Sequence, residues 1–400
     1  MEKYFNEVVN TCVAYKEIPE FMPTGEFEGI KAITYDGANI GGKKTKVFAY
    51  LGFPKDVSEK VPAIVLVHGG AGVAFLPWVK MWNDRGYAAI AMSTTGDFPL
   101  EVNAGGECGS DLDTKWQHGL YGVFTEDGYV GAPKNDEMGN FDKPFDEQWM
   151  PHAMTQVIYA HNILRSDARV DSDRIGITGI SWGGVITSLT VGYDKRFVFA
   201  APVYGSGYLT ESLGFVGEFF RKGTNPDKWL AENRFDDVKI PMLWVCWNWD
   251  QPFSINSNSK SYEHTFKNNP DNRLCMVDGL GHSHERGWIR QEIEFFADSV
   301  CKKTTKLANI KYEASKIILD IPEEACLLSV KLYSIPEKMS YNTPGEYNLI
   351  YMDQQWKIED LDIKESGSEY ILPDYAKQYY FELTVLINGK EYITTTKFFE

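Results

Sequence analysis

The sequence has little that would link it to a membrane, to nucleic acid or to an oxidising compartment. Its 400 residues contain no apolar stretch approaching the roughly 18 residues of a membrane helix, and residues 1–21 lack the apolar segment of a signal peptide. Lysines and arginines number 40 against 56 aspartates and glutamates, whereas nucleic acid and anionic lipid select clustered basic side chains. The six cysteines are scattered, with no C-x-x-C pair, which is typical of free thiols. We therefore expect a cytoplasmic protein with no nucleic-acid partner and no membrane partner.

Common motifs for cofactors and metals are also missing. Two glycine-rich segments stand out, HGGAG at 68–72 and GITGISWGGV at 176–185. No lysine follows the glycines as a phosphate-binding P-loop requires, and neither segment opens a helix with the G-x-G-x-x-G of a dinucleotide site. The chain also has no H-E-x-x-H. We expect no cofactor and no metal.

Short apolar runs alternate with amphipathic stretches between about residues 61 and 296. The apolar runs predict buried strands at 62–70, 87–94, 173–180, 197–205, 240–250 and 273–280. Strands alternating with helices predict an α/β fold with a doubly wound, mostly parallel sheet. The N-terminal segment, through KTKVFAYLGFP at 44–54, is expected to add antiparallel strands at the edge of this sheet.

The pattern changes near residue 304, so we expect two domains. Residues 1–304 form the α/β domain, with a long insertion at 96–150. Residues 305–400 show short period-two runs separated by Pro, Gly and Asn, which predict a small all-β sandwich of the immunoglobulin or fibronectin type. The Asn388–Gly389 pair predicts a type I′ hairpin within it.

A Ser–Asp–His constellation follows three of the predicted strands. Ser181 lies in G-x-S-x-G between a strand and a helix, the context of a nucleophile elbow. Asp250 ends one later strand and His282 follows the last one, so that the order is serine, acid, histidine, as in α/β-hydrolases. A serine hydroxyl needs a neighbouring base, and the base needs an acid to hold its tautomer. His284 lies two residues beyond His282 and keeps the choice of base open.

The other expected site residues surround this constellation. Backbone N–H groups of Gly70 or Ala71, together with that of Trp182, are the predicted oxyanion donors. His68 is expected to hold the HGGAG loop in shape. The predicted pocket residues are His68, Trp116, Trp249 and His284.

Five segments carry a resemblance to a known family: KVFAYLGFP, AIVLVHGGAG, RGYAAIAM, RIGITGISWGG and GLGHSH. Over about residues 40–300 the chain resembles the dienelactone hydrolase and acetyl xylan esterase branch of the α/β-hydrolases. The resemblance implies ester hydrolysis through an acyl-enzyme, often of acetyl groups on sugars. It also implies Ser181 as nucleophile, Asp250 as acid, His282 as base and an oxyanion loop at 69–71. The insertion and the β-rich segment depart from the core family.

The sequence thus predicts a serine carboxylic-ester hydrolase for short acyl esters, with a small-molecule ester such as an acylated sugar as its substrate. One alternative is a serine peptidase similar to prolyl oligopeptidases, although those carry a large propeller for which this chain has no room. Another is a non-catalytic carbohydrate-binding protein with a vestigial triad, against which the intact triad argues.

Overall fold

A computed structural model describes residues 1–55, 58–106, 121–134, 140–221, 227–339, 341–342, 351–352, 355–363, 367 and 369–400. Its main feature is a 13-stranded sheet in the order β1-β2-β3-β5-β4-β8-β9-β10-β11-β20-β19-β14-β17. The strands from β5 to β11 are parallel to one another. They are β4 (Val61–Val67), β5 (Ala88–Met92), β8 (Val170–Ile180), β9 (Ala200–Val203), β10 (Leu243–Trp247) and β11 (Arg273–Val277). Each predicted buried strand overlaps one of them.

Both faces of this parallel region are covered. All residues of β5 are buried, and so are those of β4 after Val61. Since neighbouring side chains of a strand point to opposite faces, continuous burial requires a layer on each side. The layers come from α2 (Leu76–Asp84), α4 (Trp149–Ser166), α5 (Trp182–Tyr193) and α7 (Ile255–Phe266). The sheet confirms the doubly wound α/β prediction.

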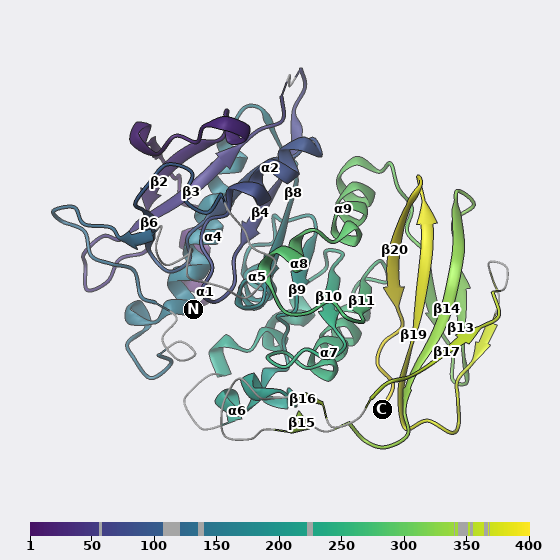
Figure 1. The fold of residues 1–400 in the computed structure, drawn as a ribbon. Helices are drawn as coiled ribbons and strands as arrows, with labels where there is room; N and C mark the ends of the chain where they lie inside the picture. Colours follow the sequence, from purple (N-terminus) through teal and green to yellow (C-terminus); the bar gives the residue numbers. More distant parts are fainter. Residues whose placement is uncertain are drawn as a thin grey trace.

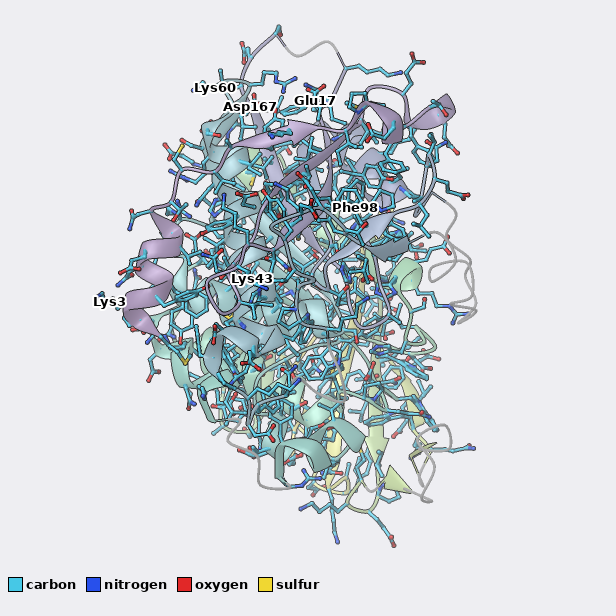
Figure 2. All side chains as sticks on the ribbon, turned by 90° about the vertical axis from the view of Figure 1, so that its left-hand side faces the viewer. Lys3, Glu17, Lys43, Lys60, Phe98 and Asp167 are labelled. Atoms are coloured by element: carbon cyan, nitrogen blue, oxygen red, sulfur yellow. The ribbon has the colours of Figure 1, made fainter. Side chains whose placement is uncertain are left out.

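The N-terminal strands extend one edge of the sheet. β1 (Tyr15–Glu17), β2 (Lys31–Asp36) and β3 (Lys46–Gly52) pair antiparallel with one another, and β3 pairs antiparallel with β5. This confirms the antiparallel edge. Figure 2 views the molecule from this side, where the labelled Lys3 of α1 (Glu2–Val9) and Glu17 lie at the surface.

The C-terminal strands join the same sheet at its other end. β20 (Lys390–Thr395) pairs antiparallel with β11 and is followed outward by β19 (Gln378–Ile387), β14 (Ala325–Ile335) and β17 (Lys357–Leu361). A second sheet of β12 (Asn309–Tyr312), β13 (Lys316–Asp320) and β18 (Glu369–Ile371) packs on them over its own apolar core. The two layers match a β-sandwich, but one layer is continuous with the central sheet, which the sequence did not predict (Figure 1). The division at residue 304 stays a prediction.

Short elements complete the described chain. Asn388 and Gly389 have φ values of 51° and 75° between β19 and β20, which confirms the predicted hairpin turn. The remaining short strands are β6 (Asp97–Pro99), β7 (Tyr121–Val123), β15 (Tyr341–Asn342) and β16 (Tyr351–Met352). The remaining helices are η1 (Pro19–Phe21), η2 (Gly25–Phe27), η3 (Phe145–Glu147), η4 (Leu209–Glu211), α6 (Phe215–Arg221), η5 (Asp227–Trp229), η6 (Ala231–Asp237), α8 (His284–Trp288), α9 (Gln291–Ala297) and η7 (Asp298–Lys302). None of the helices in the described ranges is both long and apolar enough to cross a membrane.

Candidate active site

Ser181 occupies a strained turn between β8 and α5. Its backbone has φ 57° and ψ −119°, a conformation that side-chain-bearing residues rarely adopt. The flanking glycines make the turn possible. A Cβ atom on Gly179 would lie 2.2 Å from the Gly183 carbonyl oxygen, and one on Gly183 would lie 2.0 Å from that of Val67. Only glycine at both positions lets α5 start this close to the ends of β8 and β4.

Asp250 and His282 form a hydrogen-bonded pair beyond the carboxyl ends of β10 and β11. The His282 Nδ1 and Asp250 Oδ2 atoms are 2.7 Å apart, and Asp250 is fully buried. The other carboxylate oxygen accepts the Phe253 N–H at 2.6 Å. The carboxylate therefore fixes the His282 tautomer and leaves Nε2 available as an acceptor.

Two aromatic rings contact the His282 imidazole. The Tyr204 ring lies 4.4 Å from it between centroids, and the Phe253 ring lies 6.2 Å away in a stacked arrangement. Within the described residues, no hydrogen bond joins Ser181 Oγ to His282. Among these residues the structure thus shows the hydrogen-bonded Asp250–His282 pair and the strained Ser181 turn as separate features.

His284 has a different environment from His282. Its Nε2 atom accepts the Gly69 N–H at 3.0 Å, so the lone pair that a general base would use is already engaged. Burial, with smaller contributions from the nearby His68 and His282 rings, lowers the pKa of His284 to about 3.

The HGGAG loop lies next to Ser181. A Cβ atom on Gly69 would be 2.9 Å from the Ser181 Cβ. The buried His68 ring accepts the Thr94 N–H on Nε2 at 2.9 Å and donates from Nδ1 to the Gly69 carbonyl at 2.8 Å. Burial also lowers the pKa of His68. The loop is thus anchored beside the elbow.

The three predicted oxyanion donors are unengaged. In the described part of the chain, the N–H groups of Gly70, Ala71 and Trp182 have no hydrogen-bond acceptor. Backbone donors without partners beside a nucleophile are what a tetrahedral oxyanion requires.

The predicted pocket residues have different surroundings. Trp249 is half-buried beside Asp250, whereas His68 is buried beneath the loop, and Trp116 lies outside the described residues. The Trp182 ring contacts Trp149, Phe220 and Phe253 at centroid distances of 5.8, 6.3 and 5.9 Å.

Sequence reasoning missed Tyr204 and Phe253, both of which contact the His282 ring. Tyr204 directly follows β9, and the rule that functional side chains follow the carboxyl ends of parallel strands could have found it. Across the described residues, no three His, Cys, Asp or Glu side chains are grouped to hold a metal ion.

An α/β sheet that carries a nucleophile elbow and an Asp–His pair at the carboxyl ends of its parallel strands has the arrangement of a serine hydrolase of the α/β-hydrolase class. Two family models match the chain, the acetyl xylan esterase (AXE1) model over residues 2–211 and the prolyl oligopeptidase family model over residues 136–300. The first covers just over half of the chain. The chain belongs to the acetyl xylan esterase (AXE1) family.

Similar solved structures have low sequence identity to this chain. An acetyl xylan esterase from Paenibacillus sp. R4 is 17% identical with a TM-score of 0.52, over 74% of this chain and 92% of that one. Acetyl xylan esterase 1 from Thermoanaerobacterium sp. JW/SL YS485 is 16% identical with a TM-score of 0.48, over 74% and 92% of the two chains. The uncomplexed Pyrococcus horikoshii acylaminoacyl peptidase is 17% identical with a TM-score of 0.47, and the match covers 72% of this chain but only 43% of the peptidase. Comparison with curated protein sequences finds no match.

Proposed function

We propose that the protein hydrolyses short acyl esters, acetyl esters above all, through an acyl-enzyme formed on Ser181. The observation that carries the proposal is the 2.7 Å contact between Asp250 and His282 at the sheet edge that also bears the Ser181 elbow. The His282 Nε2 atom takes the Ser181 hydroxyl proton while Oγ bonds to the ester carbonyl carbon. His282 rather than His284 is the base, because the His284 Nε2 already accepts the Gly69 N–H.

The remaining steps use the same groups. The carbonyl oxygen becomes an oxyanion that accepts hydrogen bonds from the N–H groups of Gly70 or Ala71 and of Trp182. When the tetrahedral intermediate collapses, the bond to the alcohol oxygen breaks and His282 returns its proton to that oxygen. Water then gives a proton to His282 as its oxygen bonds to the acyl carbon. When this second tetrahedral intermediate collapses, the bond between the acyl carbon and Ser181 Oγ breaks, His282 passes the proton to Oγ, and the acid is released. Asp250 stabilises the imidazolium in both halves.

Support for a small acyl group comes from the aromatic rings beside the elbow. Trp182 and Phe253 are both buried and contact each other. Bulky rings beside Ser181 and His282 restrict the space for a long acyl chain. Support for a sugar as the alcohol part comes from membership of the acetyl xylan esterase family.

A serine peptidase is the second candidate. The prolyl oligopeptidase family model spans residues 136–300 and therefore includes Ser181, Asp250 and His282, whereas the acetyl xylan esterase model ends at residue 211. A peptidase would use the same triad on an amide, so the choice between the two depends on the leaving group.

The test compares esters and amides on three proteins. Wild type, Ser181→Ala and Ser166→Ala are assayed with p-nitrophenyl acetate, butyrate and octanoate, with acetylated xylo-oligosaccharides and with aminoacyl p-nitroanilides. Ser166 is an exposed serine at the end of α4 and controls for loss of a hydroxyl. We expect acetate to be the best ester and kcat/KM to fall by at least about 10³-fold in Ser181→Ala alone. Faster p-nitroanilide cleavage would favour the peptidase, and unchanged hydrolysis by Ser181→Ala would overturn both.

A further inference from the structure

Two histidine rings hold consecutive peptide groups of the HGGAG loop. The Gly69 N–H donates to His284 Nε2 at 3.0 Å, and the Gly69 carbonyl accepts from His68 Nδ1 at 2.8 Å. His68 is itself fixed because its Nε2 accepts the Thr94 N–H. His68 directly precedes Gly69 in the sequence, whereas His284 is 215 residues further along the chain than Gly69.

The His284 ring fits closely into the loop. A Cβ atom on Gly72 would lie 2.6 Å from His284 Nε2 and 2.8 Å from His68 Nδ1, and one on Gly69 would lie 3.2 Å from His284 Nε2. On its other side, the His284 ring contacts the fully buried Phe75 ring at 5.0 Å between centroids. The His284 ring, at the start of α8, therefore occupies a defined place between the HGGAG loop and the Phe75 ring, which precedes α2.

Both rings act as neutral imidazoles. Each Nε2 atom accepts a backbone N–H and so carries no proton of its own. Burial lowers the pKa of both side chains, to about 3 for His284. A protonated His284 would present a donor to the Gly69 N–H and lose the contact.

Peptide geometry links these contacts to the proposed oxyanion donors. In a trans peptide the carbonyl and the following N–H point in opposite directions, and the described chain contains no cis peptide. The bond from His68 to the Gly69 carbonyl therefore sets the direction of the Gly70 N–H. Glycine peptides rotate easily, so this direction depends on the hydrogen bonds to the Gly69 carbonyl, which also accepts the Gly72 N–H at 3.1 Å. The bond from the Gly69 N–H to His284 holds the preceding peptide and resists the same rotation.

We propose that His284 is a positioning residue for ester hydrolysis, which accepts the Gly69 N–H and, together with His68, keeps the Gly70 N–H directed at the oxyanion. The inference rests on the proposed function and assigns His284 a task separate from that of the base. His284 acts through the loop, without touching the substrate.

The test separates hydrogen bonding from filling of space. His284→Leu removes the acceptor, and His284→Gln offers a side-chain oxygen in its place. His264→Gln is the matched control, because His264 is hydrogen-bonded through both nitrogens, to Tyr208 and Asp236, away from the loop. For each protein kcat and KM are measured with p-nitrophenyl acetate, together with thermal unfolding. The rate ratio between an ester and its thionoester is also measured, since the sulfur accepts hydrogen bonds poorly and reports on the oxyanion donors.

We expect His284→Leu to lower kcat by about 10- to 100-fold, somewhat less than complete loss of one oxyanion donor. KM should stay within about threefold, and the preference for the ester over the thionoester should fall. His284→Gln should recover most of kcat and of this preference, while His264→Gln should match wild type. An unchanged kcat in His284→Leu overturns the inference, as does equal impairment of both variants with a lowered melting temperature.

Two further outcomes keep the inference distinct from the proposed function. If His282→Ala stays active while both His284 variants lose the basic group from the pH–rate profile, His284 is the base and the positioning role is wrong. If the wild type hydrolyses none of the esters and a fluorophosphonate does not label Ser181, the proposed function itself fails. A labelled but slow wild type still permits the test, with the labelling rate of each variant in place of kcat.

Discussion

The Tyr380 hydroxyl connects the C-terminal strands to the loop that carries the proposed acid. The Asn248 Nδ2 group donates to this hydroxyl at 2.9 Å, across 132 residues of sequence, and both side chains are fully buried. Asn248 precedes Asp250 by two residues. The other amide atom of Asn248, Oδ1, has no hydrogen-bond partner among the described residues. Tyr380→Phe would thus leave the Asn248 amide without a partner.

Loss of this hydrogen bond should lower the free energy of unfolding, because the Asn248 amide is buried. A buried polar group left unsatisfied costs about 1–3 kcal/mol. With an unfolding entropy of about 2.1 cal/mol/K per residue, the melting temperature should fall by about 1–4 °C. If the Asp250 loop shifts and about 1 kcal/mol of this cost is added to the activation free energy, kcat should fall by about fivefold.

The neighbouring Tyr379 provides the control. Its ring stacks on Phe399 at 4.8 Å, and within the described chain its hydroxyl makes no hydrogen bond. Differential scanning calorimetry and p-nitrophenyl acetate hydrolysis are run on Tyr380→Phe and Tyr379→Phe. If Tyr380→Phe equals Tyr379→Phe in both melting temperature and kcat, the buried hydroxyl supports nothing at the active site and the reasoning is wrong.

Two other substitutions test a buried carboxyl group on β19 and the close packing of the Ser181 turn. Glu382 on β19 is buried, and burial, with Asp278 nearby, raises its pKa from 4.5 to about 7. Because the pKa is higher in the folded state than in the unfolded state, the free energy of unfolding of the wild type should fall by up to about 3 kcal/mol as the pH rises from 4.5 to 7. The Glu382→Gln variant should show no such fall when the two proteins are compared by calorimetry at pH 5 and 8. Parallel losses in both proteins would contradict this reasoning. In urea, Gly183→Ala should have a free energy of unfolding at least about 3 kcal/mol below that of the wild type, because its Cβ would lie 2.0 Å from a backbone oxygen. Gly131→Ala is the control and should leave the free energy of unfolding nearly unchanged, because its Cβ would lie 3.4 Å from Val123. Equal urea midpoints for Gly183→Ala and Gly131→Ala would show that α5 can move away from the end of β4 to make room for the added methyl group.

Local patterns were enough to predict the strands and the elbow. Continuous apolar runs identify strands buried on both faces, and each predicted run of the parallel region overlaps a strand of the structure. The glycines around Ser181 are explained by distances near 2 Å to neighbouring backbone. The structure brings Asp250 next to His282, as the order of the strands suggested, because both follow the carboxyl ends of adjacent parallel strands.

Contacts between distant segments could not be predicted in this way. Nothing in the spacing of GLGHSH shows that the second histidine, rather than the first, faces Gly69, because the two are only two residues apart after the same strand. Likewise, the period-two runs after residue 304 predict strands with one buried face but not which strand edge they join. The contact between Asn248 and Tyr380 depends on that junction.

The pairing of β20 with β11 affects the strand that leads to His282, the proposed base. His282 follows β11, and in the described sheet β11 lies between β10 and β20. Without β20, the strand leading to the base would be an exposed edge with unpaired N–H and carbonyl groups. Side chains from the C-terminal segment, among them Tyr333, Ile335 and Phe398, also belong to the apolar core of the α/β region. The C-terminal strands therefore belong to the scaffold that carries Asp250 and His282, the proposed acid and base, and this β-rich region supports the proposed site structurally.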